Sequence, residues 1–220
     1  MSRVLVIGDV HCPVQHHKYL RFCKNVAEEY ETNRTIFIGD VIDWHAISFH
    51  TKNPDSPGPL AEYHKAKKEL QKYYRAFPKA TVLIGNHDKR PERLAETTGI
   101  PQLLLKSYNE LWGTKGWKWV EEIDELDGVH YFHGVGYGGM HPAYNAMRTM
   151  QMSVVMGHVH CTAGIEWAAN PQRKSFGMNT GCGIDRHAAA MVYGKPARKK
   201  PTLGCGVVLN GKPYYEIMDL

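Results

Sequence analysis

Aspartate, asparagine and histidine recur in five short motifs along the chain, and most of these motifs begin with glycine. In chain order they are Gly8-Asp9-Val10-His11, Gly39-Asp40-Val41-Ile42-Asp43, Gly85-Asn86-His87-Asp88, His133-Gly134 and Gly157-His158-Val159-His160. Carboxylate, amide and imidazole groups are the donors that hold manganese, iron or zinc in proteins. In an extended segment, residues two positions apart point to the same side, so each D-x-H or H-x-H pair can face one ion. The motifs therefore predict a metal site built from several separate segments.

Each motif follows a short apolar run that is typical of a buried β-strand. The runs span residues 3–7, 35–38, 81–84, 129–132 and 153–156. Segments with apolar residues at helical spacing lie between them, clearly at 16–30 and 61–77 and more weakly at 93–98, 102–112 and 142–151. Strands that alternate with helices predict an α/β sheet. Ligands of such sheets bind beyond the carboxyl ends of the strands, so the five motifs are expected to face one crevice.

The last third of the chain has a different pattern. Short strands are predicted at 175–178, 204–209 and 214–218, and Asn210-Gly211 predicts a tight hairpin between the last two. We expect these strands to contribute to a second sheet packed on the first. The segment 53–59 predicts a loop because of its three prolines, and 114–122 predicts a turn followed by a strand or an aromatic patch. Since the sequence contains no repeat and no linker, residues 1–220 are expected to form a single domain.

The composition excludes several classes of protein. With 43% hydrophobic and 22% charged residues, the chain is neither disordered nor fibrous. No apolar run approaches the ~18 residues of a membrane span, and the first residues do not resemble a secretory signal. Five cysteines without a C-x-x-C spacing favour reduced thiols over a disulfide framework. We therefore expect a cytoplasmic protein that does not associate with membranes.

The five motifs, in this order, resemble those of the calcineurin-like metallophosphoesterases, and the resemblance spans residues 5–160. It implies an α/β fold, a four-layer α/β/β/α sandwich of two mixed sheets flanked by helices. It also implies two divalent metal ions, with manganese expected first and iron, zinc, nickel or magnesium as alternatives. The implied ligands are Asp9, His11 and His160 for one ion, Asn86, His133 and His158 for the other, and Asp40 as a bridge. His130 is three residues from His133 on the same predicted strand, so it is expected to point to the other face.

The same resemblance implies hydrolysis of a phosphate ester, in which a hydroxide that bridges the two ions attacks phosphorus in line. His87 would act at the leaving oxygen, either as a general acid or by stabilising the developing charge. Asp43 would hold the other nitrogen of His87 and fix its tautomer. Asn86 and Arg90 are the candidates for contact with the substrate phosphate, although Arg90 is equally compatible with a solvated loop.

Two departures from the family pattern bear on the substrate. The protein serine/threonine phosphatases of the superfamily have Asp-Arg and Gly-Asn-His-Glu where this chain has Asp43-Trp44 and Gly-Asn-His-Asp. The sequence is more similar to the broad group of bacterial and phage phosphoesterases. The Asp43-Trp44 departure, the net charge of +5 and the lack of a large cap insertion favour a phosphodiester, such as a nucleic acid or nucleotide. The alternatives are a phosphomonoesterase acting on a nucleotide or another small ester and, more remotely, a non-catalytic scaffold.

The sequence allows two interpretations for several other residues. His45 and His50 either line the cleft or are ordinary loop histidines. The basic residues between 65 and 75 favour the solvated face of a helix. The tryptophans Trp112, Trp117 and Trp119 could stack bases, but packing in the core is favoured. The oligomeric state is open, with a dimer as the common case for such chains.

Overall fold

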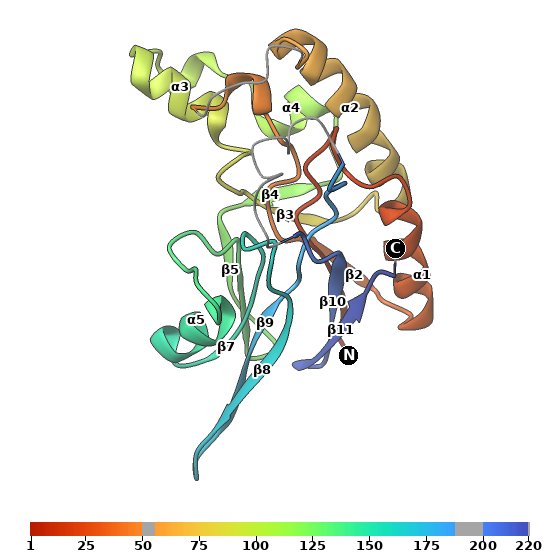
Figure 1. Cartoon of the computed structure of the whole chain (residues 1–220), viewed down its shortest axis with the longest axis vertical. Coiled ribbons are helices and arrows are strands. Elements are labelled where there is room, and N and C mark those ends of the chain that lie inside the picture. Colours follow the sequence, from red (N-terminus) through yellow and green to blue (C-terminus); the bar gives the residue numbers. More distant parts are fainter. Residues whose placement is uncertain (50–55, 188–199, 220) are drawn as a thin grey trace.

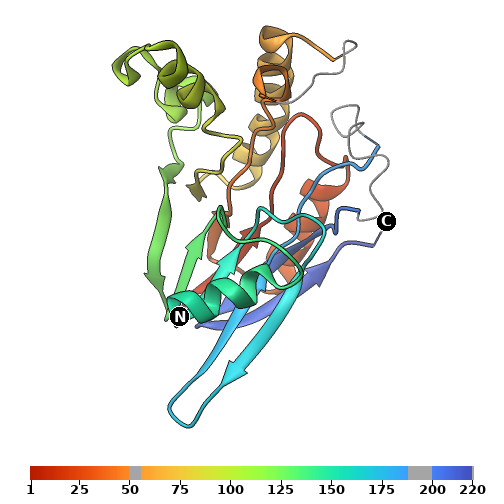
Figure 2. The ribbon, with the colours of Figure 1, turned by 60° about the vertical axis from the view of Figure 1, so that its left-hand side comes forward.

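Two β-sheets pack face to face in the computed structural model, which describes residues 1–49, 56–187 and 200–219. Helices cover the outer face of each sheet, and the two views of the ribbon show them on opposite sides of the molecule (Figures 1 and 2). The layers therefore run helix, sheet, sheet, helix. This arrangement confirms the predicted α/β/β/α sandwich.

The first sheet carries the first three motifs. Its strands, in spatial order, are β11 (Lys212–Ile217), β10 (Gly204–Leu209), β1 (Arg3–Ile7), β2 (Arg34–Phe37), β3 (Thr81–Leu83) and β4 (Lys118–Val120). Strands β1 to β4 run parallel, whereas β10 pairs antiparallel with both β1 and β11. Because β1, β2 and β3 are parallel, the motifs that follow them meet at one edge of the sheet.

The second sheet carries the other two motifs. Its strands, in spatial order, are β5 (Glu122–Leu126), β6 (Val129–Phe132), β7 (Ser153–Met156), β9 (Lys174–Asn179) and β8 (Gly164–Ala169). Strands β6, β7 and β9 are parallel to one another, and β5 and β8 are antiparallel edge strands. The carboxyl ends of β6 and β7 therefore also lie side by side.

The central strands are mostly apolar because both of their faces are buried. In β1, Val4 and Val6 point into the core between the sheets, and Leu5 and Ile7 point into the core under the helices. This explains why such strands are continuous apolar runs rather than alternating ones. The sequence predicted the bounds of β1, β6 and β7 as the structure has them.

Several helices have start or stop signals that are visible in the sequence. They are α1 (Tyr19–Glu29), α2 (Pro59–Ala76), α3 (Arg90–Thr98), α4 (Tyr108–Trp112) and α5 (Pro142–Met150), with short 3₁₀ turns at His45–Ile47 and Gln102–Leu104. Helices α2 and α5 begin with proline, which suits the first helical position. Helix α4 begins with a capping box between Ser107 and Glu110, and α3 ends at Gly99 in the left-handed conformation.

The structure corrects three expectations about the elements. The hairpin of β10 and β11 joins the first sheet beside β1, not the second sheet as predicted. The segment 102–112 contains a 3₁₀ turn and the short α4 in place of one helix. Pro59, expected in a loop, begins α2, and residues 53–55 of that expected loop lie outside the described residues.

The three tryptophans between residues 112 and 119 pack in or against the hydrophobic core. Trp112 and Trp117 are buried in the core under the helices, as favoured from the sequence, and Trp119 packs against it. In the described part of the chain, no helix combines the length and the apolar character needed to cross a membrane.

Candidate metal centre

The loops after β1, β2, β3, β6 and β7 converge at one end of the sandwich. Backbone hydrogen bonds hold them together: His11 N donates to Asp40 O at 2.9 Å, and Gly157 N donates to His133 O at 3.0 Å. His11, Asp40 and His158, which are not glycines, adopt a left-handed backbone, with φ of 53°, 47° and 67° respectively. Such conformations are uncommon outside glycine and cluster at functional sites. The chain thus holds these three side chains in positions that an ordinary strand end would not provide.

One group of donors lies mainly at the end of β1. The ligand atoms of Asp9, His11, Asp40 and His160 all lie within 4.8 Å of one another. His160 Nε2 is 2.9 Å from Asp9 Oδ2 and 3.3 Å from His11 Nε2. The structure therefore brings together every residue predicted for the first ion, together with the predicted bridge.

A second group shares Asp40 with the first. The ligand atoms of Asp40, His133 and His158 lie within 4.8 Å of one another. His133 Nε2 is 3.1 Å from Asp40 Oδ2 and 3.1 Å from Asn86 Oδ1. His130 lies elsewhere, with its Nδ1 3.1 Å from Asp124 O. The residues predicted for the second ion thus also meet, and Asp40 is the side chain common to both groups.

The residues present fit a pair of divalent cations. Asp9 Oδ1 is buried and has no hydrogen-bond partner among the described residues, as expected of an oxygen that an ion would contact. Gly85 and Gly157 leave room for the two carboxylates, because a Cβ on either glycine would collide with Asp40 Oδ1 or Asp9 Oδ1. The donor set of carboxylate, amide and imidazole suits manganese, iron or zinc.

The electrostatics of the centre are dominated by two buried carboxylates among several imidazoles. Burial acts to lower the pKa of His133, but Asp40 and Asp9 raise it to about 10. Burial acts to raise the pKa of Asp40, but His133 and His87 hold it well below its ordinary value. Asp40 is therefore an anion that requires nearby positive charge, which a bound cation would supply.

Asp43 contacts the two histidines on either side of it. Its Oδ1 is 2.9 Å from His11 Nδ1 and 3.2 Å from His87 Nδ1, and its backbone oxygen is 2.9 Å from the same His87 nitrogen. Burial acts to raise the pKa of Asp43, but the hydrogen bonds with His11 and His87 lower it. An ionised Asp43 accepting at Nδ1 leaves Nε2 of His87 as the nitrogen on the side away from Asp43.

Arg90 is part of this arrangement. It is buried at the start of α3, so the alternative of a solvated loop is wrong. Its Nη1 donates to Asp43 O at 2.6 Å, and its Nη2 lies 3.1 Å from His87 Nε2. The guanidinium therefore lies beside the nitrogen predicted to act at the leaving oxygen.

Two buried acids position the loops, and the sequence patterns did not reveal the first of them. Glu62 in α2 accepts hydrogen bonds from His45 N and Ala46 N, both at 2.7 Å, and so holds the loop that follows Asp43. A glutamate in a lysine-rich amphipathic helix carries no signal of burial. Asp88 accepts from Gly85 N at 2.9 Å and from Ile42 N at 3.0 Å, so it joins two of the motifs rather than facing the centre.

The other residues that the sequence placed near the cleft differ in where the structure puts them. His45 is buried and lines a cavity of about 190 Å³ together with Asp43 and Lys65. His50 lies outside the described residues. Trp44 is buried, and its ring centroid lies 5.4 Å from that of Trp112. The residue that distinguishes this motif from the protein phosphatases therefore packs in the core.

Comparisons with known proteins place the chain in a family. The family model described as Calcineurin-like phosphoesterase matches residues 2–162. Among solved structures, Vps29 of Entamoeba histolytica is 13% identical, with 99% of each chain covered and a TM-score of 0.43. The phosphoesterase YfcE of E. coli is 12% identical (94% of this chain and 88% of that chain, TM-score 0.46). The nuclease MPE of Pseudomonas putida is 14% identical (98% and 87%, TM-score 0.37). No curated protein sequence matches the chain.

Proposed function

The chain belongs to the calcineurin-like phosphoesterase family, and from this premise we propose that it is a metal-dependent hydrolase that prefers phosphodiesters. The observation that carries the proposal is the position of Asp40, whose carboxylate belongs to both groups of potential metal ligands. One shared carboxylate between two sets of donors is the arrangement that a pair of neighbouring cations requires.

The metal ligands in this proposal are those of the two groups. Asp9, His11 and His160 would hold one ion, Asn86, His133 and His158 the other, and Asp40 both. Bound ions, with manganese expected first, would polarise the phosphoryl oxygens and lower the pKa of a water molecule. Asn86 also lies close enough to the centre for its amide to contact a substrate oxygen.

His87 would act at the leaving oxygen through Nε2. Burial acts to lower the pKa of its imidazole, but Asp40 and the hydrogen bond with Asp43 raise it. An imidazole that carries a proton on Nε2 can transfer it to the leaving group. Asp43 fixes the orientation of the ring through Nδ1, so Asp43 is proposed as a positioning residue.

The position of Arg90 supports a role for this residue in substrate binding. Its guanidinium lies within hydrogen-bond distance of His87 Nε2, so a phosphate bound there would come within its reach. An arginine can donate two parallel hydrogen bonds to a phosphate. The net charge of +5 further favours an extended anionic substrate such as a nucleic acid or a nucleotide diester.

The test is hydrolysis of bis-p-nitrophenyl phosphate and p-nitrophenyl phosphate side by side, with Mn²⁺ or with EDTA. We expect chelator-sensitive turnover that is faster on the diester, and loss of that turnover in Asp40→Ala. A faster rate on the monoester would replace the diester proposal with a phosphomonoesterase. No turnover of either ester or of nucleic acid, with metals bound, would identify a non-catalytic scaffold.

A further inference from the structure

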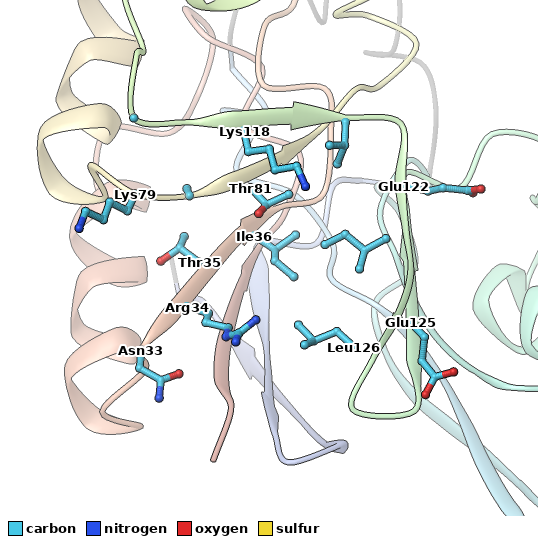
Figure 3. A pocket seen from close by; sticks show the side chains of 14 residues that line it. Asn33, Arg34, Thr35, Ile36, Lys79, Thr81, Lys118, Glu122, Glu125 and Leu126 are labelled. Atoms are coloured by element: carbon cyan, nitrogen blue, oxygen red, sulfur yellow. The ribbon is translucent and has the colours of Figure 1, made fainter.

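A second cavity, of about 800 Å³, opens between the two sheets where their edge strands β4 and β5 face each other (Figure 3). Its walls include Arg34, Thr81 and Lys118, which are the first residues of β2, β3 and β4. The metal-centre motifs follow the last residues of β2 and β3, so Arg34 and Thr81 lie at the opposite ends of these strands from the motifs. Cavities of this size commonly bind small molecules.

The first sheet is incompletely paired where the cavity lies. Strand β2 pairs with β3 only through Ile36 and Phe37, so Arg34 and Thr35 have no strand partner on that side. Strand β5 of the second sheet forms the facing wall. The core between the sheets is therefore open here.

The floor of the cavity is apolar. Ile36 is a buried member of the core between the sheets, and Ile123 and Leu126 pack against that core while partly exposed. Val120 contributes in the same way from β4. An apolar ligand that covered this floor would remove hydrophobic surface from water, which is favourable.

Among the described residues around the floor, the positive and negative side chains do not form ion pairs with one another that would neutralise their charges. In Figure 3 the side chains of Arg34 and Lys118 turn toward the middle of the cavity, whereas the carboxylates of Glu122 and Glu125 turn away. Glu122 instead lies 3.5 Å from His130 Nε2. Within the described parts of the chain, neither Arg34 nor Lys118 forms an ion pair. The cavity thus presents positive charge above an apolar floor.

We propose that this cavity binds a small organic anion with an apolar body, such as an aryl or acyl carboxylate, sulfonate or phosphate ester. The cations Arg34 and Lys118 would contact the anionic group, and Ile123 and Leu126 would contact the apolar body. An inorganic anion would gain nothing from the floor, and a neutral apolar molecule would gain nothing from the cations. This site is independent of the proposed hydrolysis.

Titration of the full chain with the fluorescent aryl sulfonate 8-anilinonaphthalene-1-sulfonate tests the proposal. We expect saturable binding at one site with the same affinity in Mn²⁺ and in EDTA, and displacement by decanoate but not by inorganic phosphate. Replacing both cations, in Arg34→Gln/Lys118→Gln, should weaken binding by about tenfold. Leu126→Ser should weaken it as well, through the apolar floor.

Lys79→Gln is the matched control, because Lys79 lines the same cavity but its side chain points away from the middle in Figure 3. Its affinity should equal that of the wild-type protein. All four positions lie at the surface or at its edge, so circular dichroism should show unchanged folding. Unchanged affinity in the double variant, displacement by inorganic phosphate, or binding that depends on Mn²⁺ would overturn the proposal.

Discussion

Hydrogen-bond partners on neighbouring motifs hold the carboxylate of Asp40 in place. Its Oδ1 accepts a hydrogen bond from His87 N at 2.7 Å, and its Oδ2 lies 3.1 Å from His133 Nε2. The left-handed backbone at Asp40 and the missing side chain of Gly85 make this position accessible. A site of this kind depends on glycines as much as on ligands, because a single methyl group can occupy the space that the carboxylate needs.

Gly157→Ala tests this dependence on one side of the centre. The added Cβ would collide with Asp9 Oδ1 and with Ile38, so we expect binding of the first ion to be lost while the second is retained. Metal analysis after dialysis against Mn²⁺ should fall from two ions per chain to one. Asp40→Ala should lose both ions. Gly58→Ala, where the new Cβ meets nothing within 4 Å, should retain both. Two ions in Gly157→Ala would contradict the assignment of Asp9.

His87→Ala separates chemistry from metal binding. Removing a general acid commonly lowers turnover about 10²–10⁴-fold, and we expect a loss of that size with the metal content unchanged. Steady-state rates measure the turnover, and metal analysis of the same preparation measures the metal content. Loss of both metals in this variant would show that His87 holds the centre together, contrary to the role proposed for it.

At the scale of elements, α2 positions the loop that carries Asp43. Glu62 from this helix binds two backbone N–H groups of the loop. Trp44 packs between Tyr63 of the same helix and Trp112 of α4, with ring centroids 6.4 and 5.4 Å away. The backbone oxygen of Asp43, which contacts His87, is therefore placed by helices on the outside of the sheet.

Glu62→Gln should lower the free energy of unfolding by about 1–3 kcal/mol, because the amide nitrogen of glutamine cannot accept a hydrogen bond, whereas both oxygens of a carboxyl group can. Burial raises the pKa of Glu62 above its ordinary 4.5, so the folded protein holds this proton more tightly than the unfolded chain. The contribution of Glu62 to stability then falls as the pH rises through the folded pKa.

The stability difference between the wild-type protein and Glu62→Gln is therefore expected to be larger at pH 4.5 than at pH 7. Urea unfolding at the two pH values measures it. Glu28→Gln serves as the control, since Glu28 is exposed on α1 and should show almost no effect. A larger difference at pH 7 than at pH 4.5 would mean that the folded protein does not hold the proton of Glu62 more tightly than the unfolded chain.

The elements differ in how far the sequence could predict them. Strands with both faces buried, such as β1, are apolar after their first residue and are followed by glycine, so local patterns suffice. The partner of the β10–β11 hairpin could not be predicted, because β10 pairs with β1 from the other end of the chain. The motif residues were predicted to meet because each follows a strand. Glu62 was missed because only tertiary contacts bury it.

At the scale of the whole molecule, the candidate centre joins the two sheets. Asp9, Asp40 and Asn86 follow strands of the first sheet, and His133 and His158 follow strands of the second. Ions bound by both sets would link the layers at one end of the sandwich. Metal binding should therefore stabilise the packing of one sheet on the other as well as the site.

Chelation should lower the melting temperature. A ligand at 100 times its dissociation constant stabilises the folded state by about 2.7 kcal/mol, which corresponds to roughly 5–10 °C for a protein of this size. Differential scanning calorimetry with EDTA and then with excess Mn²⁺ should show this shift and its reversal. Asp40→Ala should melt at the same temperature under both conditions. An unshifted wild-type transition would mean that no ion binds preferentially to the folded state.

The place of β10 beside β1 has a consequence for synthesis on the ribosome. Strand β1 is made first, yet its neighbour on one side comes only with residues 204–209. At about 5–20 residues per second, a delay of ~10–40 s separates the two strands. Throughout that time an apolar strand has an open edge that can pair with another nascent chain. The yield of native protein should then depend on chaperones that shield this edge. Slower initiation of translation should raise that yield, because fewer nascent chains would be present together to aggregate.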